Sequence, residues 1–311
     1  MADIVVTVGV PREGFSLLAG HTVHIPEDGR EFTHDELMAL IPQADAVIAC
    51  KSLSGDVIRA GKRLKIVANY GSGYNAIDIQ AAAACGIPVT NTPEETASAT
   101  AEMTIGLMMA VVRRIGEMNL RLREPNAESY FTMGYEMGHT LCGKHLAIIG
   151  MGHIGSEVGR IAEALGMTVT GLRRRDVTGS LRDAVADVIA DADIVSLHCP
   201  LNDETHWLMD ADMIAHMKQG SYLINAARGP VIDENALADA LESGHLAGAG
   251  LDVYPDEPHV PERLKHFHNI VLTPHHSANT VETRRAMAEA CSRQVLDVLD
   301  GKRPRNIVNG L

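Results

Sequence analysis

Cysteine is scarce and unpatterned: the 311 residues contain five cysteines, which are widely scattered and show no C-x-x-C spacing. An odd number of separated thiols argues against a disulfide framework and against a zinc knuckle, because both need regular spacings. We therefore expect free thiols in a reducing compartment, and hence a cytoplasmic protein. The five are Cys50, Cys85, Cys142, Cys199 and Cys291.

Long apolar runs and an excess of basic residues are also missing. The run Ile4–Val8 is too short, and Asp3 too early, for a signal peptide, so none is expected. The stretch Met103–Val112 is half as long as the ~20 residues of a membrane-spanning helix, which predicts a buried helix instead. Lys plus Arg number 27 against 40 Asp plus Glu, a formal charge of −13. This acidic balance argues against nucleic acid and membrane surfaces as partners.

What the sequence does contain is the composition of ordinary globular domains, with 46% hydrophobic and 22% charged residues. It has no solenoid repeat and no low-complexity segment, and at ~150 residues per domain the length predicts two domains. Short β-rich runs alternate with helical patterns almost from end to end. This alternation predicts the α/β class, with doubly wound parallel sheets covered by helices on both faces.

The first third of the chain carries four predicted strands and two well-marked helices. Thr33 and Glu36 have the spacing of a capping box ahead of an apolar helical pattern. The Ala-rich segment Ile77–Cys85 predicts a helix that ends at Gly86. The strands are expected at Ile4–Val8, Ala46–Ala49, Leu64–Ala68 and Pro88–Thr90.

A second α/β series follows a long helix, expected at about 98–112, and a polar segment, Arg121–Thr140, with weak periodicity. The last helix, at about 280–299, presents apolar residues at helical spacing. The pattern divides the chain into one domain near residues 1–97 and another near 98–279, and it leaves the last helix open to either. Strands of the second series are expected at His145–Ile149, Thr168–Thr170, Ile194–His198, Tyr222–Asn225, Gly248–Val253 and Ile270–Thr273.

A glycine-rich turn lies between a predicted strand and a predicted helix: residues 150–155 read Gly-Met-Gly-His-Ile-Gly. In the G-x-G-x-x-G pattern, Gly150 permits the tight turn, Gly152 lets the backbone approach a pyrophosphate, and Gly155 allows close helix–strand packing. The helix N-terminus supplies amides and a positive dipole to the phosphates. The turn therefore predicts dinucleotide binding; the alternative is a tight strand–helix turn without a ligand.

The next predicted strand runs into Arg173, Arg174 and Arg175, where an NAD-binding fingerprint has an acidic residue. Arginine cannot accept hydrogen bonds from ribose hydroxyls, but its forked donors suit a 2′-phosphate. The pattern predicts NADP(H) as the preferred cofactor and NAD(H) as the second. The alternative is a solvated basic turn that Asp176 partly neutralises.

Three later strand ends bring an arginine, carboxylates and a histidine to the same edge as the glycine turn. The first carries Arg228, the second Asp252 and Glu257, and the third His275. Ligands bind outside the carboxyl ends of the strands in open α/β sheets. Singly, Arg228 or Asp252 would be an ordinary ion-pair member and His275 a loop histidine. Together they suit proton transfer at an oxygen of an anionic substrate.

In this order the motifs resemble those of the D-isomer-specific 2-hydroxyacid dehydrogenases, in particular the glyoxylate/hydroxypyruvate reductases. The resemblance covers essentially the whole chain. It includes residues 70–78 (Tyr-Gly-Ser-Gly-Tyr-Asn-Ala-Ile-Asp), which look like the family's substrate loop, and His-Cys-Pro-Leu at 198–201. It implies a Rossmann dinucleotide-binding domain at 98–279, inserted in a flavodoxin-like substrate domain built from 1–97 and 280–311.

The resemblance also implies an activity, the NAD(P)H-dependent reduction of a small 2-oxo acid to the D-2-hydroxy acid, and the reverse oxidation. His275 resembles the general acid/base, and Glu257 the partner that stabilises its imidazolium form. Arg228 resembles the residue that holds the substrate carboxylate and polarises the carbonyl. Backbone amides around Ser72 and Gly73 would bind the carboxylate as well.

A further set of residues is implied to bind the cofactor. Asp252 resembles a carboxylate near the nicotinamide that orients the carboxamide, and Cys199 is expected to contribute packing or backbone contact, not nucleophilic catalysis. No metal is expected, because the histidines lack a ligand pattern. The implied set is Ser72, Gly150, Gly152, His153, Ile154, Gly155, Arg173, Arg174, Cys199, Pro200, Thr205, Ala226 and Asp252.

The resemblance further implies a homodimer formed through residues 121–140, and catalysis in a cleft between the domains that closes to exclude water. Which 2-hydroxy acid is used stays open. Lys51 would either contact the extra anionic group of a phosphorylated or larger substrate or be an ordinary exposed lysine. The role of His276 is also open. The competing class is a non-catalytic dinucleotide sensor like the corepressors of this fold.

Overall fold

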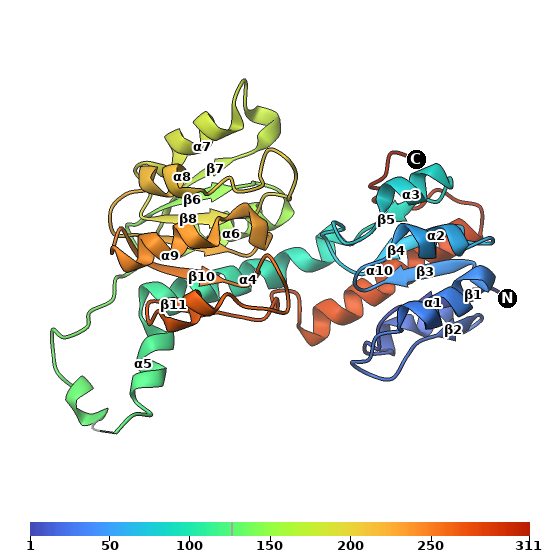
Figure 1. The fold of residues 1–311 in the computed structure, drawn as a ribbon, viewed down its shortest axis with the longest axis horizontal. Coiled ribbons are helices and arrows are strands. Elements are labelled where there is room, and N and C mark those ends of the chain that lie inside the picture. The colour runs from blue at the N-terminus through green and yellow to red at the C-terminus, as the bar shows by residue number, and fades with distance from the viewer. Residues whose placement is uncertain (126) are drawn as a thin grey trace. The chain divides into compact units, whose positions relative to one another are not determined.

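The computed structural model describes residues 1–125 and 127–311 and divides the chain into two compact units. Unit 1 consists of Met1–Thr96 and Ala278–Leu311, and unit 2 of Ala97–Ser277. Residue 126, in the predicted dimerisation segment 121–140, lies outside the described residues. Each unit is an α/β fold around one sheet, as Figure 1 shows.

The sheet of unit 1 has five parallel strands in the order β2-β1-β3-β4-β5, the flavodoxin-like order. Three of the four predicted strands shift by one or two residues at one or both ends. β2 was not predicted, because its three residues are only half-buried and form no apolar run. The strands are β1 Asp3–Val6, β2 Thr22–His24, β3 Ala46–Ala49, β4 Ile66–Asn69 and β5 Val89–Thr90.

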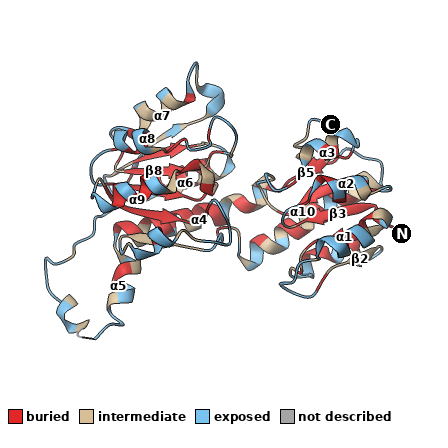
Figure 2. Cartoon of the chain, viewed as in Figure 1, coloured by how far each residue is buried: buried red, intermediate tan, exposed pale blue. Residues whose placement is uncertain are grey.

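Helices cover both faces of this sheet. On one face Val47 and Val67 of the sheet pack with Ile58 of α2. On the other face Ile4 packs with Cys291 of α10, so the last helix, which the sequence pattern left open, lies against the sheet of unit 1. Figure 2 shows the strands buried between half-exposed helices. The helices are α1 His34–Leu40, α2 Gly55–Ala60, α3 Ile79–Ala84 and α10 Val281–Leu299.

Two local signals of unit 1 are confirmed. The hydroxyl of Thr33 accepts from the amide of Glu36 at 3.3 Å, and the Glu36 carboxylate accepts from the amide of Thr33 at 2.8 Å, which completes the capping box of α1. Gly86 follows α3 with φ +69°, a left-handed conformation that glycine adopts without the penalty of a Cβ.

The sheet of unit 2 has six parallel strands in the order β11-β10-β9-β8-β6-β7. Because β6 lies between β7 and β8, the strand order reverses beside β6, which is where doubly wound sheets bind ligands. One strand, β7, lies beyond β6. The strands are β6 His145–Ile149, β7 Thr168–Leu172, β8 Ile194–Leu197, β9 Ser221–Asn225, β10 Leu246–Leu251 and β11 Ile270–Leu272.

Two hydrophobic clusters cover the faces of this sheet. Leu107 of α4 and Val158 of α6 pack on one face, and Val185 of α7 and Leu237 of α9 pack on the other. α4 begins at Pro93, five residues before its expected start, and runs from unit 1 into unit 2. The helices are α4 Pro93–Val112, α5 Ile115–Arg121, α6 His153–Ala164, α7 Leu181–Ile189, α8 Ala211–His216 and α9 Glu234–Glu242.

A break that the sequence did not predict separates α4 from α5. Arg114 adopts a left-handed conformation, with φ 55°, and its guanidinium pairs with Glu117 at 2.8 Å. Short 3-10 helices complete the fold: η1 Glu13–Leu18, η2 Ile41–Gln43, η3 Ala127–Tyr130, η4 Arg174–Asp176, η5 Gly229–Val231 and η6 Glu262–His266.

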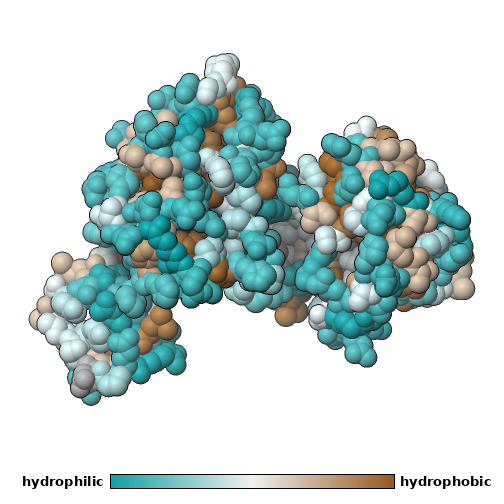
Figure 3. All heavy atoms as spheres, in the orientation of Figure 1, coloured by the Kyte–Doolittle hydropathy of each residue, from teal (hydrophilic) through white to brown (hydrophobic). Residues whose placement is uncertain are grey.

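The predicted fold class, two doubly wound parallel-sheet domains, is confirmed by these two sheets and their helical layers. Within the described ranges 1–125 and 127–311, no helix has both the length and the apolarity to cross a membrane. In the view of Figure 3, hydrophilic side chains cover most of the surface of each unit.

Candidate active site

The glycine turn connects β6 to α6 and leaves an open surface at the helix N-terminus. Gly150 has φ +105°, and a Cβ there would come within 2.5 Å of the carbonyl carbon of His198. A Cβ on Gly155 would collide with the carbonyl oxygen of Gly150, whereas one on Gly152 would meet no atom within 4 Å. The first and third glycines are therefore required by packing, and the second keeps the backbone accessible.

The first turn of α6 fits a diphosphate. Within the described part of the chain, the amides of His153, Ile154 and Gly155 donate to no protein acceptor. Gly152, the N-cap residue, has no side chain to cap these amides. Free amides at the positive end of a 12-residue helix suit an anion, so the residues present fit the pyrophosphate of a dinucleotide.

The residues predicted beside the cofactor after β8 and β9 are mostly buried. Burial raises the pKa of Cys199 to about 11, so its thiol is protonated at neutral pH and unsuited to nucleophilic attack. The hydroxyl of Thr205 donates to the carbonyl of Pro200 at 2.6 Å and accepts from the amide of Asn202 at 2.9 Å. These bonds fix the turn after β8. Ala226 lies buried at the end of β9.

The arginines that follow β7 differ in their partners. The Nε of Arg173 donates to the carbonyl of Met151 at 2.6 Å, so Arg173 lies against the glycine turn itself. Arg174 makes a forked ion pair with Glu204, at 2.8 and 2.9 Å, and Arg175 is exposed beside Asp176. Glu204 was not predicted as a site residue, because it lies 30 residues from Arg174 in the sequence and no local pattern indicates that the two side chains meet.

His275 and Glu257 form a hydrogen-bonded pair at the carboxyl edge of the sheet. The Nδ1 of His275 lies 2.7 Å from the carboxylate of Glu257, whose other oxygen accepts from the amide of Tyr254 at 3.1 Å. A carboxylate can only accept, so Nδ1 carries the proton and Nε2 is left to exchange a proton with a ligand. The His275 side chain is 48% exposed and so remains accessible.

Asp252 holds the loop that carries His275. One oxygen of its buried carboxylate accepts from the hydroxyl of Thr273 at 2.6 Å and from the amide of His276 at 2.8 Å. The other accepts from the amide of Ser277 at 3.0 Å and from its hydroxyl. His275 itself has φ 54°, a conformation that is uncommon outside glycine. The carboxylate therefore fixes the loop backbone, and its predicted contact with the nicotinamide stays a prediction.

Arg228 extends from a turn that a buried asparagine shapes. The side chain of Asn225 accepts from the amide of Ala227 and donates to the carbonyl of Arg228, both at 3.0 Å. A Cβ on Gly229 would overlap the backbone of Tyr254, so only glycine lets this turn approach the loop that carries Glu257. Neither contact was predicted from the sequence: the spacing of Asn225, Arg228 and Gly229 is visible there, but the close approach of Gly229 to Tyr254 is not.

Burial and opposite charge act on Arg228 and Glu257. Burial lowers the pKa of Arg228, and the charge of Glu257 counteracts that effect. Burial alone would raise the pKa of Glu257, but hydrogen bonds from His275 and Tyr254, with the charges of His275 and Arg228, bring it below its ordinary value. Glu257 is therefore ionised at neutral pH and sustains a charged, hydrogen-bonded partner for His275.

Unit 1 carries the predicted substrate loop after β4. Ser72 is half-buried and Gly73 exposed, and the side-chain amide of Asn69 donates to the carbonyls of Gly71 and Gly73 at 2.7 and 3.1 Å. Lys51, at the end of β3, forms an ion pair with Glu31. The site residues thus fall into two groups, Ser72 and Gly73 in unit 1 and the rest in unit 2.

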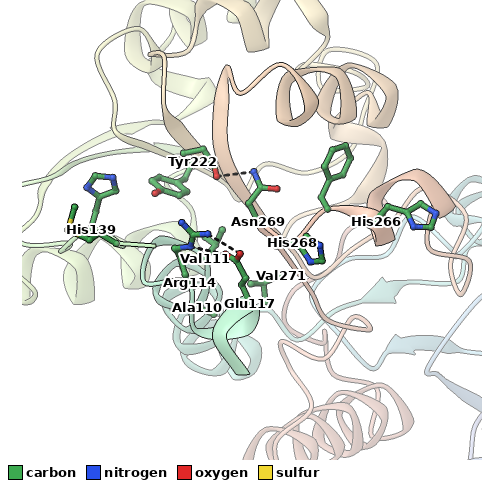
Figure 4. Close-up of a pocket in the computed structure, with 13 residues that line it drawn as sticks. Ala110, Val111, Arg114, Glu117, His139, Tyr222, His266, His268, Asn269 and Val271 are labelled. Carbon is green, nitrogen blue, oxygen red and sulfur yellow. Dashed lines mark hydrogen bonds and ion pairs between the residues drawn. The ribbon is translucent and has the colours of Figure 1, made fainter. Parts of the chain in front are cut away.

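A cavity of about 540 Å³ lies in unit 2 away from this edge (Figure 4). Its lining includes Tyr222, Asn269 and Val271, near the amino ends of β9 and β11, together with the ion pair of Arg114 and Glu117. The glycine turn and His275 lie at the opposite, carboxyl ends of the strands. This cavity is therefore not the candidate active site.

In the described ranges, no cluster of His, Cys, Asp or Glu could hold a metal ion.

Comparison with known proteins identifies a dehydrogenase family whose chemistry agrees with the geometry of the site. The profile of the "D-isomer specific 2-hydroxyacid dehydrogenase, NAD binding domain" matches residues 105–277, more than half of the chain. A putative 2-hydroxyacid dehydrogenase of Staphylococcus aureus is 37% identical over 99% of this chain and 100% of its own.

Two solved structures are similar over nearly their full lengths. A protein from Thermus thermophilus has a TM-score of 0.88 and 35% identity, covering 98% of this chain and 99% of its own. An NADPH-dependent glyoxylate/hydroxypyruvate reductase from Sinorhizobium meliloti has a TM-score of 0.85 and 27% identity, covering 99% and 98%. The chain belongs to the D-isomer specific 2-hydroxyacid dehydrogenase family, and residues 105–277 form its NAD-binding domain.

Proposed function

We propose that this oxidoreductase reduces a small 2-oxo acid, glyoxylate or hydroxypyruvate, to the D-2-hydroxy acid with NADPH preferred over NADH, and catalyses the reverse oxidation. The observation that carries the proposal is the His275–Glu257 pair, at 2.7 Å, on the same sheet edge as the glycine turn. The similarity to an NADPH-dependent glyoxylate/hydroxypyruvate reductase supports the choice of substrate and cofactor.

In this proposal, the bound nicotinamide supplies or accepts the hydride, and the chain's own residues move the proton and bind the acid. Nε2 of His275 donates a proton to the carbonyl oxygen during reduction and takes it back during oxidation. Glu257 keeps Nδ1 protonated, so that Nε2 serves as the working nitrogen. The proton thus moves at one defined atom.

Arg228 and the amides of Ser72 and Gly73 are proposed to bind the substrate carboxylate. The guanidinium matches a planar carboxylate through two parallel hydrogen bonds, and its charge polarises the neighbouring carbonyl. Its partial burial strengthens these interactions, because the surrounding dielectric is lower than in water. Both groups recognise the acid function that all 2-oxo acids share, and neither one selects the side chain.

The proposal is tested by initial rates of NADPH and NADH oxidation, side by side, with glyoxylate, hydroxypyruvate, pyruvate and phenylpyruvate. A clear NADPH-dependent rate with glyoxylate or hydroxypyruvate is expected. A rate with phenylpyruvate alone would replace the small substrate by a larger one. Binding of NADPH without turnover of any acid would favour a dinucleotide sensor.

The alternative substrate, a phosphorylated acid bound by Lys51, has less support than a small 2-oxo acid. Lys51 pairs with Glu31, so a phosphate would have to compete with a carboxylate already in place. The pair favours the smaller substrate.

We predict that the double variant Arg173→Gln/Arg174→Gln binds NADPH about a hundredfold more weakly, while its affinity for NADH changes by less than about threefold. Each guanidinium would lose a charge-assisted hydrogen bond to the 2′-phosphate, at roughly tenfold apiece. Dissociation constants for both cofactors can be measured by nicotinamide fluorescence. Equal losses for NADPH and NADH would mean that the arginines do not read the 2′-phosphate.

A variant of Glu204 provides a second test, because the Glu204 carboxylate accepts both hydrogen bonds that the Arg174 guanidinium could donate to a 2′-phosphate. Glu204→Gln is expected to bind NADPH a few times more tightly, since the 2′-phosphate no longer displaces a carboxylate. Glu242→Gln is the matched control: it removes the carboxylate of Glu242, on α9, from its ion pair with Arg263, and should leave both affinities unchanged. Weaker NADPH binding in Glu204→Gln would show that Glu204 holds Arg174 in place instead.

A homodimer is also proposed, formed through the segment 121–140. Its apolar side chains are exposed to a degree unusual for a soluble surface: Phe131 is 83% and Met133 99% exposed. The described part of the segment projects from unit 2 in Figure 1, beyond α5. A second copy of the chain would cover these side chains.

The dimer proposal predicts that Phe131→Asp/Met133→Asp sediments as one chain where the wild type sediments as two. Charges in place of apolar contacts should weaken the association at micromolar concentrations, because each must be desolvated at the interface. Val281→Asp, at an 83% exposed apolar residue of unit 1, is the control and should leave the mass unchanged. A monomeric wild type would refute the dimer, and a dimeric double variant would place the interface elsewhere.

A further inference from the structure

The carbonyls of the loop after β4 accept hydrogen bonds from Asn69, the last residue of β4, and from residues 91 and 92, which follow β5. The carbonyl of Gly71 accepts from the side-chain amide of Asn69 at 2.7 Å and from the backbone amide of Thr92 at 3.0 Å. The carbonyl of Ser72 accepts from the side chain of Asn91 at 2.7 Å, and that of Gly73 from Asn69 at 3.1 Å. Three successive carbonyls therefore point towards the protein.

Because the peptide bond is planar, the direction of each carbonyl also fixes the direction of the next amide. In a trans peptide the C=O and the following N–H point in opposite directions. Anchoring the carbonyls of Gly71, Ser72 and Gly73 therefore turns the N–H groups of Ser72, Gly73 and Tyr74 away from the protein. Within the described ranges these three amides donate to no protein acceptor. Successive free amides of this kind form a concave anion-binding site.

We propose that Asn69 and Asn91 are positioning residues, whose side-chain amides hold the loop so that the amides of Ser72, Gly73 and Tyr74 bind the substrate carboxylate. The inference rests on the proposed function and deepens it, because it adds a third amide and identifies what aims all three. Both asparagines are buried: Asn69 is 6% and Asn91 8% exposed. They therefore act on the substrate through the loop and not by direct contact.

The last helix holds one of the two asparagines in turn. Gln294 of α10 donates to the backbone carbonyl of Asn91 at 2.9 Å and accepts from the hydroxyl of Thr90 at 2.8 Å. The amide of Asn91 donates to the carbonyl of Asn306 at 3.3 Å. The end of β5 is therefore fixed by the C-terminal segment, which gives the Asn91 side chain a rigid base.

The test compares Asn69→Ala and Asn91→Ala with wild type in glyoxylate reduction by NADPH. Each variant is expected to raise the KM for glyoxylate about tenfold, with kcat changed by less than about threefold and the Kd for NADPH unchanged. The carboxylate keeps its charge throughout the reaction, so losing its amides weakens ground state and transition state alike, which moves KM. Tenfold corresponds to one lost charge-assisted hydrogen bond.

Asn309→Ala is the matched control. Its side chain also donates to a backbone carbonyl of unit 1, that of Ile87 at 2.8 Å, but does not touch the loop. We expect Asn309→Ala to lower the melting temperature, like Asn69→Ala and Asn91→Ala, because each removes a side-chain hydrogen bond to the backbone, but to leave KM unchanged. A KM within twofold of wild type in folded Asn69→Ala and Asn91→Ala would overturn the inference.

A second measurement covers variants that fail to fold. In wild-type protein with NADPH, saturating oxalate should slow hydrogen exchange of the amides at 72–74. Unchanged exchange, in a protein that oxalate inhibits, overturns the inference and leaves the proposed function intact. A wild type that neither reduces any 2-oxo acid nor binds oxalate refutes the proposed function first, and the inference with it.

Discussion

His275→Asn is expected to lower kcat by roughly 10²–10⁴-fold while leaving the Kd for NADPH within about twofold of wild type. The imidazole is the group placed to give a proton to the substrate oxygen, and asparagine cannot exchange one. Asparagine is the better substitution than alanine, because residue 275 has φ 54° and asparagine tolerates that conformation. Single-turnover reduction, with cofactor binding measured separately, checks the result.

The neighbouring histidine supplies the control. His276 is exposed, and the structure engages it through its backbone amide, which donates to Asp252 at 2.8 Å. His276→Asn keeps that amide and should retain kcat within about threefold of wild type. If His275→Asn kept kcat within tenfold of wild type, another group would supply the proton, and the assignment of His275 as the general acid/base would be wrong.

Arg228→Gln is expected to lower kcat/KM by about 10³-fold or more. It removes both the forked contact with the substrate carboxylate and a positive charge next to the carbonyl oxygen, and one such donor alone is worth about 10²–10³ in kcat. The loss should appear with every 2-oxo acid, because the acid function is common to all. Steady-state kinetics with glyoxylate and hydroxypyruvate provides the measurement.

Arg228→Lys separates charge from shape. Lysine keeps the positive charge but lacks the planar fork, so we expect an activity between that of wild type and Arg228→Gln. The melting temperature of both variants must be compared, because Arg228 is half-buried near Glu257 and the Gln variant leaves His275 as the charged partner of that carboxylate. A Gln variant with near-normal kcat/KM would remove Arg228 from the mechanism.

The sequence by itself determined the features that short windows encode. The capping box at Thr33, the strand Ala46–Ala49 and the glycine turn at 150–155 are each specified within a few residues, and the structure has all three where they were expected. The fold class followed from the alternation of strand and helix patterns, since neither kind of element can bury its apolar face alone. The strand ends then placed the candidate residues on one edge.

The tertiary structure alone decided how those residues are held. The αL conformation of His275, the approach of Gly229 to Tyr254 and the pair of Arg174 with Glu204 each depend on loops that lie apart in the chain. The hydrogen bond from Gln294 to Asn91 joins residues that lie 203 positions apart in the sequence. Such contacts arise from close packing of complete units, and no local period, cap or turn signal specifies them. The sequence therefore identified the chemical groups, and packing fixed their orientation.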